Sequence, residues 1–524
     1  MFKAAGRGIV ISLVVTLLVA IGAAPALGAA GRSEDKGSRH HPVTRFAAPA
    51  QASGQQLSAA TQGQQVTDGD HGLKANFNGV SSLDSQVTNF GLTFEPPDQG
   101  LCEGNGFVVE MVNSAFRIYG SHGATLQGPT NVNAPFHEDF AAFTSDPRCH
   151  YDSATNTWFA TILFINDAGT QSHLDIAYNT SGDPTTDWSV FQIDTTDQTA
   201  AGTPQCPCFG DQPRLGIDSS NIYVNADEFP IDPNATDYYG SEIDVVSKAD
   251  LVAHRTNPHH VHFGHLTNPD GTPTLAIEPA LTTGPAPAEY FLESLDPTGT
   301  GDHRIAVWAL TNVDRVEDGG RPSLSSLIIG SEAYGIPPGA VQKGSTQTLD
   351  SGDDRMQQTQ FINGEIWGEL TTAVTPQGDS VKRAGAAWFR VRPQIRGRGL
   401  IGATVTGQGY VAAQGQYVIY PALQVDGRGD GAMVFTVSSS QRFPSAAYAM
   451  FDRDSSTFGG PIVAAKGSGP YVVVNRRWGD YSWAVVDFST DTIWMATEYM
   501  PPRSSQTTNG HNPWGTRVLA LELS

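Results

Sequence analysis

Aspartates recur at the start of short apolar runs, and their carboxylates are the first candidates for chemistry in this chain. Asp98, Asp146, Asp211 and Asp480 each stand just before such a run or within its first residues. In repeated antiparallel meanders the first strands all begin at one edge, so these four side chains should ring one mouth of a central channel. Inward carboxylates repel one another unless they are protonated or bind a cation. One hypothesis is therefore a calcium site, and the alternative is a structural role as acceptors of backbone hydrogen bonds.

Two glutamates depart from this aspartate pattern. Glu228 and Glu498 each stand at the end of an expected second strand, which places them on the same rim. Two carboxyl groups about 5 to 10 Å apart can cleave a glycosidic bond, one as acid and the other as nucleophile or base. The predicted catalytic residues are therefore Glu228 and Glu498, with Asp480 and, for a lyase, Tyr481 beside them.

Cationic and aromatic side chains on this rim are the predicted substrate-binding residues. An arginine cluster can grip a carboxylate through paired N–H donors, and an aromatic ring can stack on a sugar. The predicted set comprises Arg148, Arg214, Arg355, Trp478 and Tyr499. A second cluster, the four histidines between His259 and His265, shows no acidic partner in register, so we expect an exposed loop there rather than a metal site.

The elements that must position these residues are short strands. Runs rich in Val, Ile, Phe, Tyr and Trp alternate with Gly, Asp, Asn and Pro, and no segment keeps a helical period for more than two turns. Residues 210–218 and 479–487 are similar to each other, and 146–152 provides a third copy. We expect an all-β fold, a single β-propeller of seven four-stranded blades over residues 91–524. Six or eight blades, or a pair of β-sandwiches, are the alternatives.

The N-terminus reads as an export signal followed by a linker. Lys3 and Arg7 precede an uncharged apolar run too short to span a membrane, and small residues follow, so residues 1–30 are predicted to be a cleaved signal peptide. Residues 31–90 are rich in Gly, Ser, Gln and Ala, which predicts a flexible linker. We expect a secreted, extracellular protein whose last strand, 516–523, pairs with a strand near 88–94 and closes the ring.

Composition excludes several classes of protein. The 524 residues carry a net charge of −22, which argues against nucleic-acid binding, and no second apolar run reaches the length of a membrane span. The four cysteines predict two disulfides in an exported protein, with three pairings open. We expect a monomer that binds an extracellular glycan or polysaccharide.

Several motifs resemble a family of secreted bacterial β-propeller proteins of largely uncharacterised function. They are Ser145–Arg148, Gly210–Pro213 with Asp227–Phe229, and Arg477–Ser482 with Thr497–Tyr499. The resemblance spans about residues 95–500 and implies an exported propeller, but it brings no catalytic residue. A weaker likeness, carried by Ser181, Asp183 and Trp188, is to the Asp-box of sialidase-type propellers.

Two functions of different class are consistent with these residues. The first is a carbohydrate-active enzyme, a glycoside hydrolase or polysaccharide lyase that acts at the channel mouth. The second is a non-catalytic propeller that binds an extracellular glycan, peptide or surface partner, because a repeated aspartate is more typical of architecture than of a unique active site.

Overall fold

The computed structural model describes residues 64–166, 168–196, 208–231, 238–296, 299–473, 477–507 and 513–523. The expected signal peptide, residues 1–30, and residues 31–63 of the expected linker lie outside these ranges. The described chain is mostly strand, as predicted. Its helical elements are short: α2 (Ser82–Thr88), α3 (Lys248–Val252), and the 3-10 turns η1 (Val313–Val316) and η2 (Arg503–Ser505).

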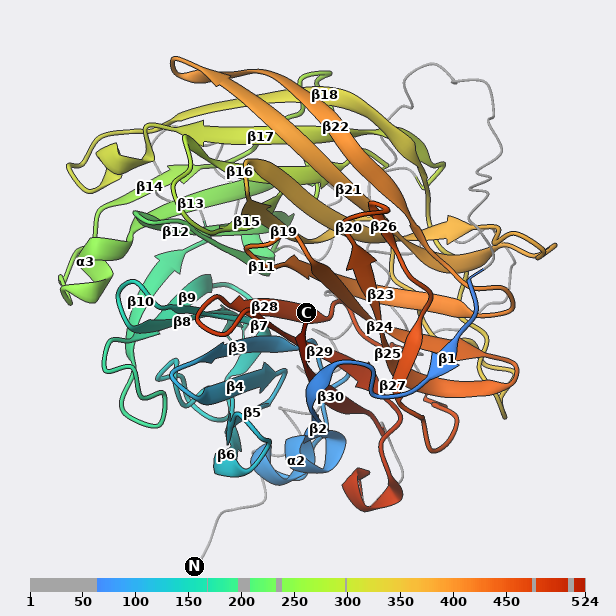
Figure 1. The fold of residues 1–524 in the computed structure, drawn as a ribbon. Coiled ribbons are helices and arrows are strands. Elements are labelled where there is room, and N and C mark those ends of the chain that lie inside the picture. The colour runs from blue at the N-terminus through green and yellow to red at the C-terminus, as the bar shows by residue number, and fades with distance from the viewer. Residues whose placement is uncertain are drawn as a thin grey trace, which may run out of the picture.

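Most strands form antiparallel meanders in which each strand pairs with the next (Figure 1). The first meander contains β3 (Gly100–Gly104), β4 (Phe107–Val112), β5 (Ala115–Gly120) and β6 (Thr125–Asn131). The second contains β7 (Phe143–Asp152), β8 (Thr157–Ile165), β9 (Ser172–Asn179) and β10 (Ser189–Asp194). The third contains β11 (Cys208–Ile217), β12 (Asn221–Pro230), β13 (Ser241–Ser247) and β14 (His260–Phe263).

The pattern continues through the C-terminal half. The fourth meander contains β15 (Glu278–Thr282), β16 (Ala288–Ser294), β17 (Asp302–Thr311) and β18 (Ser323–Tyr334). The fifth contains β19 (Met356–Ile362), β20 (Glu365–Val374), β21 (Arg383–Arg396) and β22 (Gly399–Val411). The next contains β23 (Tyr417–Val425), β24 (Gly431–Ser439), β25 (Arg442–Asp452), β26 (Thr457–Phe458) and β27 (Ile462–Ala465), with β1 (Thr67–Asp68) parallel to β27.

Tight turns between strands follow from local sequence. Asn105-Gly106 joins β3 to β4 and Asn363-Gly364 joins β19 to β20, and all four residues have positive φ. A two-residue hairpin turn needs this left-handed backbone at both positions, which Asn and Gly adopt at the lowest steric cost. The Asp-box-like segment stabilises the turn between β9 and β10. Its Trp188 is buried and donates a hydrogen bond to the carbonyl of Pro184. This segment therefore has a structural role in a turn.

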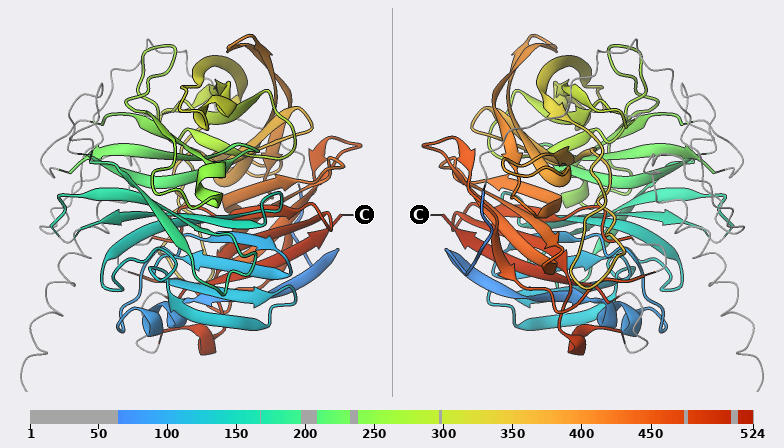
Figure 2. Two further views of the ribbon diagram at one scale, coloured as in Figure 1. Left: turned by 90° about the vertical axis from the view of Figure 1, so that its left-hand side faces the viewer. Right: turned by 90° about the vertical axis from the view of Figure 1, so that its right-hand side faces the viewer.

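The first strand of every meander lies toward the middle of the molecule, and the last strand lies at the edge (Figure 1). Neighbouring first strands lie side by side in the order β3, β7, β11, β15, β19, β23 and β28, and β28 lies beside β3 again. The side views show these sheets edge-on, with α2 and η2 together at one end (Figure 2). The starts of the first strands therefore converge on a hub.

The last meander joins the two ends of the described chain. It contains β28 (Trp483–Asp487), β29 (Thr492–Tyr499), β30 (Gly515–Glu522) and, paired antiparallel with β30, β2 (Leu73–Ser81). The sequence analysis placed the partner strand near residues 88–94 and ended the linker at 90, and both positions are wrong. Alternating side chains in 73–81 form the strand, and Ser81 then caps α2 through a capping box with Asp84.

A disulfide joins the first two meanders at their innermost strands. Cys102 on β3 is bonded to Cys149 on β7, and both side chains are fully buried. This bond resolves one of the pairings that the sequence left open. Cys208 is also disulfide-bonded, and Cys206 lies outside the described residues.

The histidine-rich segment is not the exposed loop that the sequence suggested. Residues His260–Phe263 form β14 beside β13, and His260 and His262 both contact the carboxylate of the buried Asp244. The sequence analysis missed this acidic partner because Asp244 is in register only after β13 and β14 pair.

Candidate functional site

Three carboxylates from three different meanders come together at the hub. Asp98 precedes β3, Asp146 lies in β7 and Asp480 precedes β28, and their nearest oxygens all lie within 4.8 Å of one another. Asp211, on β11, lines the same pocket. The four aspartates that the sequence analysis placed at one channel mouth therefore share one site, which we call the hub site.

A continuous hydrogen-bonded chain fixes the three carboxylates relative to one another. The backbone N–H of Asp480 donates to Asp98 Oδ1 at 2.7 Å, and Asn113 Nδ2 donates to Asp98 Oδ2 at 2.8 Å. The Oδ1 of Asn113 then accepts from the backbone N–H of Asp146 at 2.8 Å. Asp98 and Asn113 therefore position the other two residues. Asn113 was not predicted as a site residue, because a single Asn before a turn gives no sign that its side chain hydrogen-bonds to residues of two meanders.

Local backbone geometry aims the hub residues inward. Asp146 and Gln212 have left-handed φ values of 61° and 53°, each precedes a proline, and each sits in a β-bulge at the start of its strand. A bulge leaves residues unpaired and re-aims their side chains. The matching bulges in β7 and β11 show that the residue of β11 equivalent to Asp146 is Gln212. The sequence comparison had matched Asp146 with Asp211.

Crowded burial changes the ionisation of the cluster. Burial, followed by the negative charges of Asp480 and Asp146, raises the pKa of Asp98 well above its ordinary value. Burial raises the pKa of Asp146, which the Arg148 charge opposes, and raises that of Asp480 to about 6 against the lowering effect of Arg477. Asp480 is therefore mostly ionised at neutral pH, while the raised pKa values of Asp98 and Asp146 favour the protonated forms of these two neighbours.

These contacts fit proton sharing better than a calcium site. Calcium takes six to eight oxygen ligands. Both oxygens of Asp98 already accept N–H bonds, and one oxygen of Asp480 pairs with Arg477. With three of their oxygens already paired, these three carboxylates have few oxygens left for that requirement. Calcium binding by Asp98, Asp146, Asp211 and Asp480 stays a prediction from the sequence.

The hub site opens into a pocket that is part acidic and part aromatic. Phe94, Phe143 and Phe209 line it together with the aspartates, and so do Glu95 and Arg477. Burial raises the pKa of Glu95 to about 7. A ligand entering here would meet aromatic faces on one part of the wall and carboxyl groups on another.

The arginines of the predicted binding set are already held by carboxyl groups. Arg355 makes a bidentate pair with Asp353, with N–O distances of 2.8 and 2.6 Å. Arg214 is 1 % exposed and pairs with Asp227 at 2.8 Å and Glu278 at 3.3 Å. Arg214 is therefore a buried structural residue and not a substrate-binding one, which corrects that prediction.

Arg148 is also enclosed within the hub. Its guanidinium carbon lies 3.1 Å from the ring centre of Tyr481 and 4.7 Å from that of Trp483, and the residue is 1 % exposed. A cation stacked between two buried rings stabilises the packing of β7 against β28. Arg148 therefore packs between neighbouring strands and does not lie on an exposed rim, where the sequence placed it.

The aromatic residues predicted to stack on a sugar are buried elsewhere. Trp478 is fully buried against Tyr471 and donates to Thr436 Oγ1 at 3.1 Å. Tyr481 is 1 % exposed and its hydroxyl donates to the carbonyl of Pro147, and Tyr499 is 2 % exposed with its hydroxyl on Asn78. Large aromatic side chains are mostly packed between the sheets. The aromatic residues that line the pocket are phenylalanines instead.

Glu228 and Glu498 do not form a catalytic pair. Glu498 is buried near Asp98, Glu95 and Asp480, and these neighbours together with burial raise its pKa well above its ordinary value. Glu228 instead lies with Glu242 and His262. Successive side chains of a strand point to opposite faces, so Asp227 faces Arg214 while its neighbour Glu228 faces away. Glu228 and Glu498, predicted from the sequence as a catalytic pair, therefore lie in different surroundings.

Ionisation of Asp211 gives the hub a testable pH dependence. Burial, and then the charge of Asp146, raises the pKa of Asp211 from 3.8 to about 8. The folded state therefore holds a proton that the unfolded chain releases, so this contribution to stability is complete below about pH 4 and is lost as the pH rises through 8. We expect Asp211→Asn to raise the melting temperature at pH 8.5 and to raise it far less at pH 4.5.

Thermal melts of the Asp211→Asn variant at both pH values check this expectation. Asp454 lies in an exposed turn, so Asp454→Asn provides the control and should show no such dependence. A gain of equal size at the two pH values would show that Asp211 is not the titrating group.

Comparison with known proteins leaves the family open. No protein-family model matches the chain, and no curated protein matches it. Among solved structures the chain is similar to a sialidase of Trypanosoma rangeli in complex with sialic acid, with 10 % identity, a TM-score of 0.34, and coverage of 72 % of this chain and 54 % of that one. The chain thus spans little more than half the length of that sialidase.

Two further similar structures are bacterial or microbial. A protein of unknown function from Dyadobacter fermentans shows 13 % identity and a TM-score of 0.33 over 86 % of this chain and all of that one. A Hadza microbial sialidase shows 10 % identity and a TM-score of 0.33 over 80 % and 73 % of the two chains. Likenesses at TM-scores this low carry no argument about the chemistry of this chain.

Proposed function

We propose that this chain is a carbohydrate-active propeller that hydrolyses a glycosidic bond of an uncharged polysaccharide in the hub pocket. The observation that carries the proposal is the open pocket in which Asp98, Asp146 and Asp480 lie within 4.8 Å of one another. The proposal assigns the reaction to Asp146 and Asp480, with Asp98 and Asn113 as positioning residues.

The finer architecture belongs to the same proposal. The seven first strands that follow one another around the hub, from β3 to β28 and back to β3, support a closed ring of seven blades. The pairing of β2 with β30 supports a last blade completed by the N-terminal part of the chain. Such a ring holds residues from distant blades rigidly at its centre.

Asp480 suits the role of nucleophile. Its side chain is 24 % exposed and faces the pocket, and its ion pair with Arg477 keeps the carboxylate charged above about pH 6. The carboxylate would attack the anomeric carbon and form a glycosyl ester as the bond to the leaving oxygen breaks. Asp480 is the one predicted catalytic residue that lines the pocket.

Asp146 suits the role of acid and then base. It lines the pocket, and burial raises its pKa, which favours the protonated form that a general acid needs. It would give that proton to the leaving oxygen. The resulting carboxylate would then take a proton from water as the water hydrolyses the ester on Asp480.

The charges around the pocket favour an uncharged substrate. Acidic sugars need free guanidinium donors that match a carboxylate, and Arg214 and Arg355 already donate to Asp227 and Asp353. Asp480, which is ionised above about pH 6, would repel a further negative charge. The phenylalanines of the pocket can pack on the apolar face of a sugar ring.

Export is a separate part of the proposal. The buried Cys102–Cys149 disulfide supports folding in an oxidising compartment. Among the described residues, no helix is both long and apolar enough to cross a membrane. We propose a secreted monomer, and mass spectrometry of the mature N-terminus with size-exclusion chromatography tests both parts.

Product release from a panel of polysaccharides tests the function. The mature chain is incubated with uncharged, uronic-acid and sialylated glycans, and new reducing ends and absorbance near 235 nm are followed together. We expect reducing ends from uncharged polymers without new absorbance. Absorbance from unsaturated products would indicate a lyase, and no product from any polymer would favour the non-catalytic binding propeller.

A further inference from the structure

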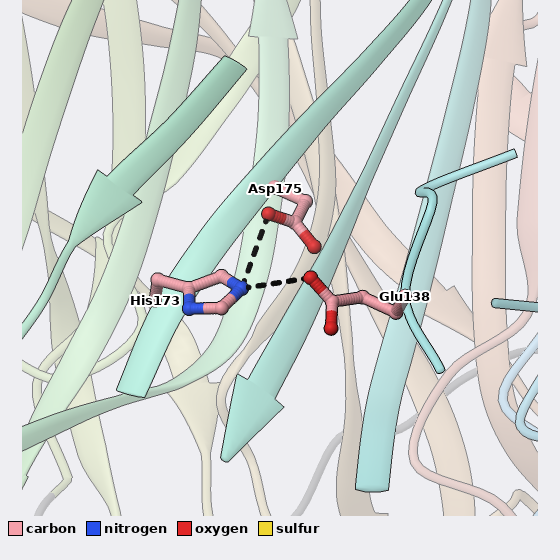
Figure 3. A group of neighbouring side chains, drawn as sticks. All are labelled: Glu138, His173 and Asp175. Carbon is pink, nitrogen blue, oxygen red and sulfur yellow. Dashed lines mark hydrogen bonds and ion pairs between the residues drawn. The ribbon is translucent and has the colours of Figure 1, made fainter. Parts of the chain in front are cut away.

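A second polar cluster lies away from the hub, between the first and second meanders. Glu138 comes from the segment between β6 and β7, and His173 and Asp175 come from β9 (Figure 3). His173 and Asp175 are two residues apart on one strand, so both side chains face Glu138. The proposed function makes no use of these residues.

The three ligand atoms converge on one point. His173 Nε2 lies 3.3 Å from Glu138 Oε1 and 3.3 Å from Asp175 Oδ1 (Figure 3). A single N–H cannot align well with two acceptors that lie in different directions. The ring of His173 is held in place by Phe164, which stacks on it with centroids 4.2 Å apart and planes 13° apart.

Gln192 on β10 provides a fourth position. Its amide nitrogen lies 3.1 Å from Glu138 Oε1 and 3.2 Å from His173 Nε2. The two ends of an amide group can exchange places by a half turn, which would put the oxygen at this point. Four potential ligands then face one another from three segments of the chain.

The two separations from His173 match the edges of a tetrahedral zinc site. Zinc binds imidazole nitrogen and carboxylate oxygen at about 2.0 to 2.2 Å, so neighbouring ligand atoms in a tetrahedron lie about 3.3 to 3.6 Å apart. The two distances from His173 Nε2 to the carboxylates, 3.3 Å each, fall at this value. The site is also shielded, with side-chain exposures of 13 % for Glu138 and 19 % for His173.

Charge balance at Asp175 points to a metal ion rather than to a simple ion pair. Its side chain is fully buried and points into the cluster, where its contact with His173 Nε2 at 3.3 Å is shared with Glu138 (Figure 3). A protonated His173 carries one positive charge, whereas Glu138 and Asp175 together carry two negative charges, and a buried carboxylate is strongly destabilising unless a cation compensates it. We propose that Glu138, His173 and Asp175, with the amide oxygen of Gln192, bind one zinc ion that ties the loop before β7 to β9 and β10.

Zinc titration of the full mature chain tests the site. The chain is stripped with a chelator and titrated with zinc chloride by calorimetry at pH 7.5, and bound metal is counted after dialysis. We expect one tightly bound zinc ion per chain and a higher melting temperature with zinc than with chelator. Asp175→Asn and His173→Gln should each weaken binding at least about a hundred-fold.

Controls separate this site from other histidines. His303→Gln removes a histidine that is 56 % exposed beside Asp302, and it should leave zinc binding unchanged. Glu138→Gln, a change at the surface side of the cluster, provides a second variant if a buried change prevents folding. Cobalt in place of zinc should give the strong visible absorption of a tetrahedral site.

Two results would overturn the proposal. Wild-type chain that binds no stoichiometric zinc would leave His173 as a protonated bridge between two carboxylates. Zinc that persists in folded Asp175→Asn and His173→Gln chains would place the ion elsewhere.

Discussion

Replacing Asp480 by Asn lowers kcat on the preferred polysaccharide by about a hundred- to ten-thousand-fold and leaves the melting temperature nearly unchanged. The amide cannot attack the anomeric carbon, so the glycosyl ester does not form. Stability is expected to change little, because the variant loses the ion pair with Arg477 but no longer buries a carboxylate whose pKa burial raises. Initial rates of reducing-end release and thermal melts measure both quantities.

The control for this variant changes the same chemical group away from the hub. Asp454→Asn, in an exposed turn, should keep full activity. The rate of the wild-type enzyme should also fall as the pH drops below about 6, where Asp480 takes up a proton. An Asp480→Asn enzyme with at least a tenth of wild-type kcat would remove Asp480 from the reaction.

The second large effect concerns stability. Arg214→Met is expected to lower the free energy of unfolding by about 3 to 5 kcal/mol, because it leaves buried carboxyl groups without their cation. Asp227 is 1 % exposed, and Arg214 is the largest influence that holds its pKa below the ordinary value despite burial. Glu278, also 1 % exposed, loses its contact with Arg214 Nε at 3.3 Å. Urea unfolding at pH 7 measures the loss.

Matched variants show whether the buried charge is the cause. Arg392 has a side chain that is 63 % exposed beside Glu365, so Arg392→Met should cost less than about 1 kcal/mol. The double variant Arg214→Met/Asp227→Asn should recover part of the loss, because it removes one of the orphaned charges. Equal losses for Arg214→Met and Arg392→Met would contradict the account of the hub.

The sequence predicted the architecture because its signals are local and repeated. Alternating apolar residues and turns such as Asn363-Gly364 specify strands and hairpins without help from the rest of the fold. The repeated aspartates at the strand starts indicated which residues meet at the hub, and Asp98, Asp146 and Asp480 do meet there. The position of β2 could not be predicted in the same way, because the composition of 64–90 resembles that of a linker.

The finer geometry of the site depends on details that a sequence does not express. One bulge residue shifts the match between Asp146 and β11 from Asp211 to Gln212. One step along β12 decides that Asp227 reaches Arg214 and that Glu228 does not. Burial is equally non-local: Trp478 and Tyr481 look like rim residues in the sequence, but neighbouring blades cover them.

The stereochemistry of the first product is the most direct test of the hub account. One carboxylate oxygen of Asp146 lies within 4.8 Å of one of Asp480, and this closeness favours the short carboxyl separation of retaining glycosidases over the roughly 6.5 to 9.5 Å of inverting ones. Proton NMR of an early reaction mixture reports the anomeric configuration before mutarotation. The account predicts retention, and inversion of the anomeric centre would contradict it.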